Sequence, residues 1–339
     1  MTTRVEQGFS RGRFFGGNFV AKSFWAFSLV ALVGCGGAAP EKPIARSLLG
    51  QELFARALPA DFEEEQSALL ATATVQVAED PQDIEAQVWR ARRLGYLGRY
   101  DEAIETLTAA MAIAPDDARL YRHRGHRFLT LRRLDEAIAD FTLAHDLTDG
   151  TPDRIEPDGL PNAAGIPTST LQTNIAYHRG LAWTCLGEWE AAQGEYARGF
   201  SLAENPDMKA AMAYWWVLNL WHLDRDAEAR LVLALIDEDW PIIENEDYHA
   251  MLLAFAGEGS PVALLEEVRR EGGLRFATVG YGVGEWLWRR GDRAAARDLW
   301  IDVVRSGPWP AFGALASEAA LRRRPLTDEE RQKLESPIE

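Results

Sequence analysis

The chain contains 339 residues, of which 47% are hydrophobic and 26% are charged, and its formal net charge is −16. This composition is typical of a globular protein and excludes a disordered, a collagen-like or a multi-span membrane protein. The excess of acidic side chains argues against nucleic acid as a partner, because phosphate binding requires a basic surface. Two cysteines are too few for a disulfide-dense scaffold or a four-cysteine zinc site.

The beginning of the chain has the pattern of a secretory signal peptide. Basic side chains dominate residues 1–22, in which Glu6 is the one acidic residue, and an apolar run extends from Phe24 to Val33. An apolar run of about ten residues suits a signal peptide, whereas a helix that crosses a bilayer needs about 20. We therefore expect residues 1–34 to be cleaved from the mature chain.

The end of this segment, Leu32-Val33-Gly34-Cys35, resembles the lipobox of bacterial lipoproteins. The resemblance implies that Cys35 is acylated, for example with palmitate, and that it anchors the chain in a lipid bilayer. Two or more acyl chains give stable membrane attachment. Gly36 stands where an aspartate retains lipoproteins in the inner membrane of enteric bacteria, which favours the outer membrane. An ordinary signal cleavage site among small residues is the alternative interpretation.

A repeat of 34 residues dominates the rest of the chain. The motif Asp-Glu-Ala-Ile at 101–104 recurs at 135–138, a spacing of 34 residues. When Ala103 is position 20 of a unit, small residues occupy positions 8, 20 and 27 and large ones positions 4, 11 and 24. Gly125 and Phe141 are an example of positions 8 and 24. This pattern resembles the tetratricopeptide repeat, in which a small residue of one helix admits a large residue of its partner helix. The resemblance implies an all-α, right-handed solenoid of helix–turn–helix pairs.

The repeat register divides the chain. A lone helix is expected from Phe62 to Val77, and Thr327 and Glu330 form a capping box at the start of the last helix. We expect a flexible tether at 35–46 and one α-solenoid over 47–339, with repeats at 84–117, 118–147, 173–206, 210–240 and 277–306, a degenerate helix pair at 244–271 and capping helices at 309–335.

Residues 148–170 interrupt the repeats. Four prolines fall within this segment, at positions 152, 157, 161 and 167, and proline is excluded from helix interiors. Loops of this length in compact proteins are usually functional or disordered. The loop and the helix after it are similar to segments in uncharacterised bacterial tetratricopeptide proteins, a resemblance that implies no activity.

Catalytic motifs are absent from the sequence, which contains no nucleophile elbow, phosphate-binding loop, zincin helix or kinase signature. His123 and His126 have the spacing of metal ligands on a helix, but Arg122, Arg124 and Arg127 surround them and repel a cation. We therefore expect a protein that is not an enzyme and has neither a metal site nor a cofactor.

The concave groove of the solenoid is the candidate binding site. The tetratricopeptide resemblance implies that positions 2, 5, 9, 12 and 13 of each first helix line this groove. These positions supply arginine, histidine, asparagine and aromatic residues, namely Arg92, Tyr96, Arg119, Arg122, His126, Asn174, Tyr177, Tyr214, Trp221, His222, Tyr281 and Trp288. Arginine binds carboxylates through a planar fork, and tyrosine and tryptophan are frequent in binding hot spots. The alternative is that the arginines form ion pairs with acidic residues on neighbouring helices and that the aromatic residues pack in the core.

Together these features predict a membrane-anchored scaffold in the bacterial cell envelope, with the solenoid in the periplasm and an unknown protein or peptide in its groove. The lipid bilayer is a second partner through acylated Cys35, and nucleic acid is not a partner. An alternative is a small-molecule-binding or enzymatic accessory protein, with a pocket near residues 148–170 that uses His126, Tyr177 and His178. A structural subunit that uses its convex face is a third interpretation.

Overall fold

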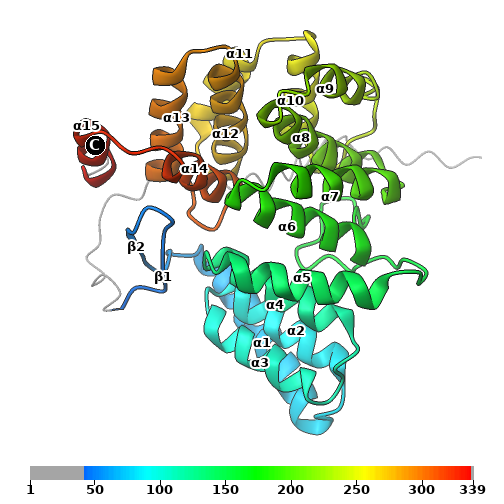
Figure 1. Cartoon of the computed structure of the whole chain (residues 1–339). Helices are drawn as coiled ribbons and strands as arrows, with labels where there is room; N and C mark the ends of the chain where they lie inside the picture. Colours follow the sequence, from blue (N-terminus) through cyan, green and yellow to red (C-terminus); the bar gives the residue numbers. More distant parts are fainter. Residues whose placement is uncertain (1–41, 337–339) are drawn as a thin grey trace, which may run out of the picture.

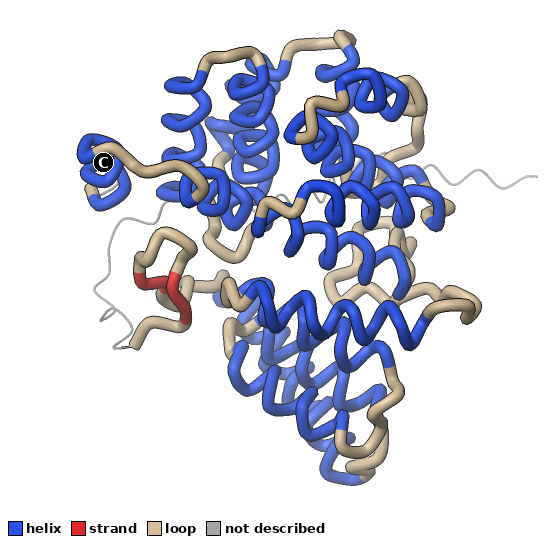
Figure 2. The backbone as a smooth tube through the Cα atoms, in the orientation of Figure 1, coloured by secondary structure: helices blue, strands red, loops and turns tan. Residues whose placement is uncertain are grey.

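The computed structural model describes residues 42–336, so the predicted signal peptide, its cleavage site and Cys35 lie outside the described residues. Within this range the chain forms 15 α-helices and one short hairpin (Figure 1, Figure 2). None of the helices between residues 42 and 336 has both the length and the apolar composition that crossing a bilayer requires.

The elements follow one another along the chain with few long connections. They are β1 (Ala45–Arg46), β2 (Glu52–Leu53), α1 (Ala60–Glu79), α2 (Ile84–Tyr96), α3 (Tyr100–Met111), α4 (Ala118–Thr130), α5 (Leu134–Thr148), α6 (Leu171–Leu186), α7 (Trp189–Leu202), α8 (Pro206–His222), α9 (Asp226–Leu233), α10 (Glu246–Ala256), α11 (Pro261–Glu271), α12 (Gly273–Arg289), α13 (Arg293–Ser306), α14 (Phe312–Arg322) and α15 (Asp328–Glu335). From α2 to α13 the helices pack in consecutive pairs.

Several helix pairs pack closely at repeat positions 8 and 24. A Cβ atom added to Gly125 of α4 would lie 2.9 Å from the ring of Phe141 in α5. The same atom added to Gly180 of α6 would lie 2.8 Å from the ring of Tyr196 in α7. Only glycine lets these helices approach so closely. This packing is what the 34-residue register predicts, and the tetratricopeptide fold is therefore confirmed.

The turn within a helix pair requires a residue with left-handed backbone. Gly98, Gly187 and Gly291 fill this position with φ of 75°, 85° and 90°. Arg132 and Asp224 fill it in two other pairs, with φ of 65° and 56°. A residue with a Cβ atom pays roughly 1–2 kcal/mol for this conformation. The repeat therefore tolerates local strain at these two turns.

Helix ends fall at capping residues. The Asp83 side chain accepts a hydrogen bond from the first turn of α2. Asn205 does the same for α8, where Pro206 occupies the first helical position. The predicted capping box of Thr327 and Glu330 is confirmed at the start of α15.

The N-terminal boundary differs from the predicted one. Residues 45–46 belong to the predicted tether, but they form β1, which pairs with β2. The hairpin packs against the C-terminal helices, since the amide of Leu48 donates to Glu318 over 2.9 Å and Gln51 Nε2 donates to the carbonyl of Leu334 over 3.3 Å. Ordered chain therefore begins before residue 47, because contacts with distant helices fix a segment that has no helical pattern of its own.

The end of the array folds back on its beginning. Helix α14 packs against α12 and α13, and also against α6 (Figure 1). Glu318 of α14 lies 2.5 Å from Arg132, at the end of α4, and both side chains are 2% exposed. The Arg132 guanidinium also donates to the carbonyl of Trp309 over 2.6 Å. This buried ion pair joins the early repeats to the capping region, so α14 covers part of the inner side of the solenoid.

Candidate partner-binding surface on the inner helices

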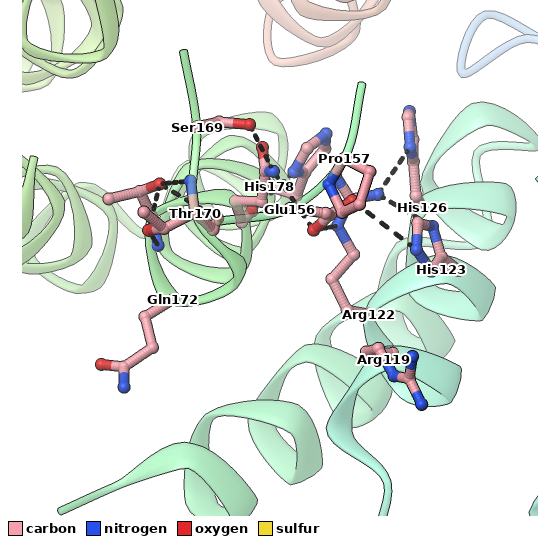
Figure 3. Close-up of polar contacts among 12 residues, drawn as sticks. Arg119, Arg122, His123, His126, Glu156, Pro157, Ser169, Thr170, Gln172 and His178 are labelled. Atoms are coloured by element: carbon pink, nitrogen blue, oxygen red, sulfur yellow. Dashed lines mark hydrogen bonds and ion pairs between the residues drawn. The ribbon is translucent and has the colours of Figure 1, made fainter. Parts of the chain in front are cut away.

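The loop of residues 149–170 lies on the first helices of three repeats, α2, α4 and α6, and places one carboxylate among them (Figure 3). Glu156 is 6% exposed. Its Oε2 atom lies 3.0 Å from Nε of Arg122 and accepts a hydrogen bond of 3.2 Å from Nδ2 of Asn174. Its Oε1 atom lies 3.6 Å from Nε2 of His123. Donors from α4 and α6 thus hold a single carboxylate in a buried position.

The positive charge that binds Glu156 belongs to Arg122 rather than to the histidine. Burial, together with the charge of Arg122, lowers the pKa of His123 well below its ordinary value, so this imidazole is neutral at pH 7. Burial also lowers the pKa of Arg122, and the charge of Glu156 opposes that effect. Arginine remains protonated in proteins, so the pair is a buried charge-assisted contact.

Two further arginines bind the backbone of the loop. Arg92 Nη1 donates to the carbonyl of Pro157 over 2.8 Å, and Arg93 Nη1 donates to the carbonyl of Gly159 over 2.9 Å. Gly159 lies directly on Tyr96, because a Cβ atom at this position would overlap the Tyr96 hydroxyl. The surface defined by Arg92, Arg93, Tyr96, Arg122 and Asn174, which we name the inner clamp, therefore binds one carboxylate and two carbonyls of an extended segment.

A further buried cation lies beside the inner clamp. Arg127 is 9% exposed, and its Nη2 atom lies 2.9 Å from Nδ1 of His126. Its guanidinium carbon lies 5.9 Å from the ring centroid of Tyr100. Among the ion pairs within residues 42–336, none joins Arg127 to a carboxylate. The inner side of α2 and α4 thus carries a local excess of positive charge in a chain that is acidic as a whole.

Two other predicted groove residues belong to a cluster of aromatic rings. The ring of His126 lies 4.5 Å from that of His178, and the ring of Phe312 lies 5.4 Å from His178 and 5.9 Å from Tyr177. Burial lowers the pKa of His126 and of His178 well below the ordinary value. Phe312, at the start of α14, packs on these rings from the other side of the array.

The predicted groove residues on α6, α8 and α12 meet in the core. The indole of Trp215 donates to the hydroxyl of Tyr177 over 2.9 Å, and the ring of Trp215 lies 5.3 Å from that of Tyr281. The hydroxyl of Tyr214 donates to the carbonyl of Thr278 over 2.9 Å. These tyrosines are buried, and burial raises their pKa well above the ordinary value. In this conformation they are packing residues rather than a lining of the groove.

Arg119 and Trp221 are also engaged in contacts within the chain. Arg119 pairs with Asp117 at 2.6 Å and with Glu85. The ring of Trp221 lies 4.7 Å from that of Phe255. The contacts of Arg119 follow the alternative in which arginines pair with nearby acidic residues.

His222 and Trp288 contact side chains at the opposite end of the array from α2. The imidazole of His222 is stacked on Trp189 at 3.9 Å between centroids, and its Nε2 atom lies 2.9 Å from the buried carboxylate of Glu285. The guanidinium of Arg324 lies 3.7 Å from the centroid of Trp288. The twelve predicted residues thus do not form one surface, and only Arg92, Tyr96, Arg122 and Asn174 share the inner clamp.

Sequence reasoning missed the loop residues that complete this site. Glu156 and Gly159 lie in a segment whose composition indicates a loop but not the position of any one side chain. Arg93 was missed because it follows a groove position of α2 rather than occupying one. The acid-proline step Glu156-Pro157 is a signal for extended backbone, since the residue before proline avoids the helical region.

No group of three or more histidine, cysteine or acidic side chains suited to a metal ion occurs between residues 42 and 336. Cys185 is buried in α6, and burial raises the pKa of its thiol to about 12. This thiol is therefore a packing group at neutral pH.

Comparison with known proteins gives structural neighbours only. No protein-family model and no curated protein matches the chain. Among solved structures, a tetratricopeptide repeat protein from Parabacteroides merdae ATCC 43184 is 13% identical, with a TM-score of 0.45 over 78% of this chain and 95% of that one. YrrB, a tetratricopeptide protein with an unusual peptide-binding site, is 14% identical, with a TM-score of 0.41 over 69% of this chain and 92% of that one. PilW, a type IV pilus biogenesis factor, is 17% identical, with a TM-score of 0.42 over 71% and 85%.

Proposed function

We propose that this chain is a non-catalytic scaffold that binds an extended, acidic segment of a partner protein on the inner clamp. The observation that carries the proposal is that the inner clamp already holds such a segment, residues 156–159 of the chain itself. Its contacts are made to one carboxylate and to backbone carbonyls, groups that a segment of another protein also offers. Buried arginines give such contacts both strength and direction.

The excess positive charge beside the inner clamp supports an acidic partner. Arg127 is buried without a carboxylate among the described residues, and Arg122 has one only because the loop supplies Glu156. Buried charges that lack a counter-ion are costly, so an anionic ligand at this surface gains from compensating them. A neutral or basic segment gains nothing comparable.

Photo-crosslinking in the native cell tests the scaffold. A photoreactive phenylalanine analogue replaces Tyr96 in the inner clamp or, as a control, the exposed Leu143 on α5. We expect a partner segment rich in aspartate or glutamate to be linked through position 96 and not through position 143, with the segment identified by mass spectrometry. Equal labelling from both positions, or none from position 96, would overturn the scaffold proposal.

We also propose that acylated Cys35 anchors the scaffold in the bacterial envelope, with the solenoid in the periplasm. The support is the lipobox-like sequence at 32–35 and the apolar run before it. We expect Cys35→Ser to move the chain from the membrane fraction to the soluble fraction, whereas Cys185→Ser leaves it in the membrane. A chain that stays membrane-bound after Cys35→Ser contradicts lipid anchoring at this residue.

A further inference from the structure

The loop on the inner clamp buries little apolar surface. Its three large aliphatic side chains point away from the core, since Ile155 is 66% exposed, Leu160 44% and Ile166 51%. The backbone of the loop is paired with itself at one isolated bridge, between Ile155 and Thr170. Segments that bury few apolar groups and have few backbone hydrogen bonds open at a low free-energy cost. The loop is therefore attached through polar contacts at two places, residues 156–159 on the inner clamp and Thr168, whose hydroxyl contacts Glu244 and whose carbonyl accepts from Asn205 over 2.7 Å.

One of these residues opposes the attachment. Asp158 lies near two acidic side chains, Glu244 and Glu156, and near the cation of Arg92. Burial, followed by the charges of Glu244 and Glu156, raises the pKa of Asp158 to about 6. The ionised carboxylate is therefore disfavoured when the loop is docked. A segment without an acidic side chain at this position binds the inner clamp without that penalty.

We infer that residues 156–159 are an internal competitor for the inner clamp, and that the partner segment displacing them carries glutamate or aspartate with glycine three residues later. This inference rests on the proposed function. The acidic residue takes the place of Glu156 between Arg122 and Asn174. The glycine takes the place of Gly159, where a Cβ atom would push aside the Tyr96 hydroxyl and Nη2 of Arg92, the ends of two side chains of the inner clamp. Of the two positions between them, the first is contacted by Arg92 through its backbone carbonyl, and the second disfavours an acidic side chain because Glu244 and Glu156 are near it.

Intramolecular competition lowers the apparent affinity for a partner. The apparent dissociation constant equals the intrinsic one divided by the fraction of molecules with an open loop. A substitution that expels the loop but leaves the arginines in place therefore raises the apparent affinity. Gly159→Ala is such a substitution, because its methyl group forces the ends of Tyr96 and Arg92 away from the docked loop but deletes neither side chain. Gly194→Ala adds the same methyl group where no atom lies within 4 Å and is the matched control.

A fluorescent peptide with the sequence of residues 153–161 is the probe, added to the full-length chain. We expect it to bind the Gly159→Ala chain at least about tenfold more tightly than the wild-type or the Gly194→Ala chain, a difference of about 1.4 kcal/mol. Versions of the peptide that carry Glu156→Gln or Gly159→Ala should bind the Gly159→Ala chain at least about tenfold more weakly than the unaltered peptide. Equal affinity for the three chains, or for the three peptides, overturns the inference.

Tryptic cleavage after the exposed Arg154 reports whether the loop has opened. We expect faster cleavage in Gly159→Ala than in Gly194→Ala, with unchanged helical content by circular dichroism. If cleavage stays slow in Gly159→Ala and in the double variant Glu156→Gln/Gly159→Ala, the loop is a fixed part of the fold and the inference is wrong.

The cross-linking experiment distinguishes a failure of the scaffold proposal from a failure of the inference about its ligand. A partner linked through position 96 whose segment lacks an acidic residue with glycine three residues later contradicts the inference but leaves the scaffold standing. The opposite result is also possible, in which the peptide binds as expected but no partner is linked through position 96 in the cell. This result supports the inferred class of ligand and contradicts the scaffold proposal.

Discussion

The inner sides of the early and late repeats use the same repeat positions for different purposes. On α2, α4 and α6 these positions are polar, and the loop covers them through Arg92, Arg122 and Asn174. On α8 and α12 they carry Tyr214 and Tyr281, which are fully buried among neighbouring helices. A register position therefore defines the direction of a side chain relative to its own helix pair.

The strongest link between the two regions is the ion pair of Arg132 and Glu318. We expect Glu318→Gln to lower the free energy of unfolding by about 3–5 kcal/mol, because it leaves the charge of Arg132 buried without a partner. Urea unfolding followed by circular dichroism measures the effect. Glu136→Gln is the control, since its pair with Arg133 is exposed and contributes about 0–1 kcal/mol. Similar losses in both variants mean that α14 does not hold the two regions together.

Close helix packing at position 8 should be equally important in both regions. We expect Gly125→Ala and Gly284→Ala each to lower the free energy of unfolding by about 1–3 kcal/mol, because the added methyl group meets the rings of Phe141 and Trp300. The same unfolding experiment on Gly194→Ala, where space is open, should show no loss. A large effect in only one of the two regions would show that the repeat packing itself differs between them.

The attachment of the loop should depend on pH. The pKa of Asp158 is raised from 3.8 to about 6 in the docked loop, so the docked state binds more protons. The contribution of Asp158 to docking is therefore largest below pH 4 and is lost as the pH rises through about 6.

A nitroxide label at Leu160→Cys measures this change by electron paramagnetic resonance. We expect the immobile fraction to fall between pH 5 and pH 7.5, on the basis of the raised pKa of Asp158. Asp158→Asn should remove the pH dependence and keep the loop docked at pH 7.5. An immobile fraction that rises with pH contradicts the assigned direction.

The smallest expected effect concerns the strained turns. We expect Asp224→Gly to raise the free energy of unfolding by up to about 1 kcal/mol, because glycine adopts the left-handed backbone of this turn without steric cost. The exposed contact of Asp224 with Arg289 offsets little of this gain. Gly98→Ala, at the equivalent turn of an early repeat, should lower the free energy of unfolding instead. Thermal unfolding of both variants measures these two opposite changes.

The sequence predicts what depends on neighbouring residues and fails where distant segments meet. The spacing of Gly125 and Phe141 predicts their contact, because both lie in one helix pair. The contact between Arg132 and Glu318 joins residues 186 positions apart, and nothing in the repeat indicates that α14 returns to α4. Glu156 is likewise missed, since a loop without periodicity does not indicate which side chain meets the inner clamp.

Hydrogen exchange on the full-length chain, with and without the peptide of residues 153–161, tests the central claim most directly. The docked loop protects the amide of Glu156, which donates to Ser169, and the amide of Leu171, which donates to Arg154. If the inner clamp is a binding surface occupied by its own loop, saturating peptide speeds exchange across residues 154–160 and leaves α8 and α12 unchanged. Unchanged exchange in the loop at saturating peptide would contradict the account.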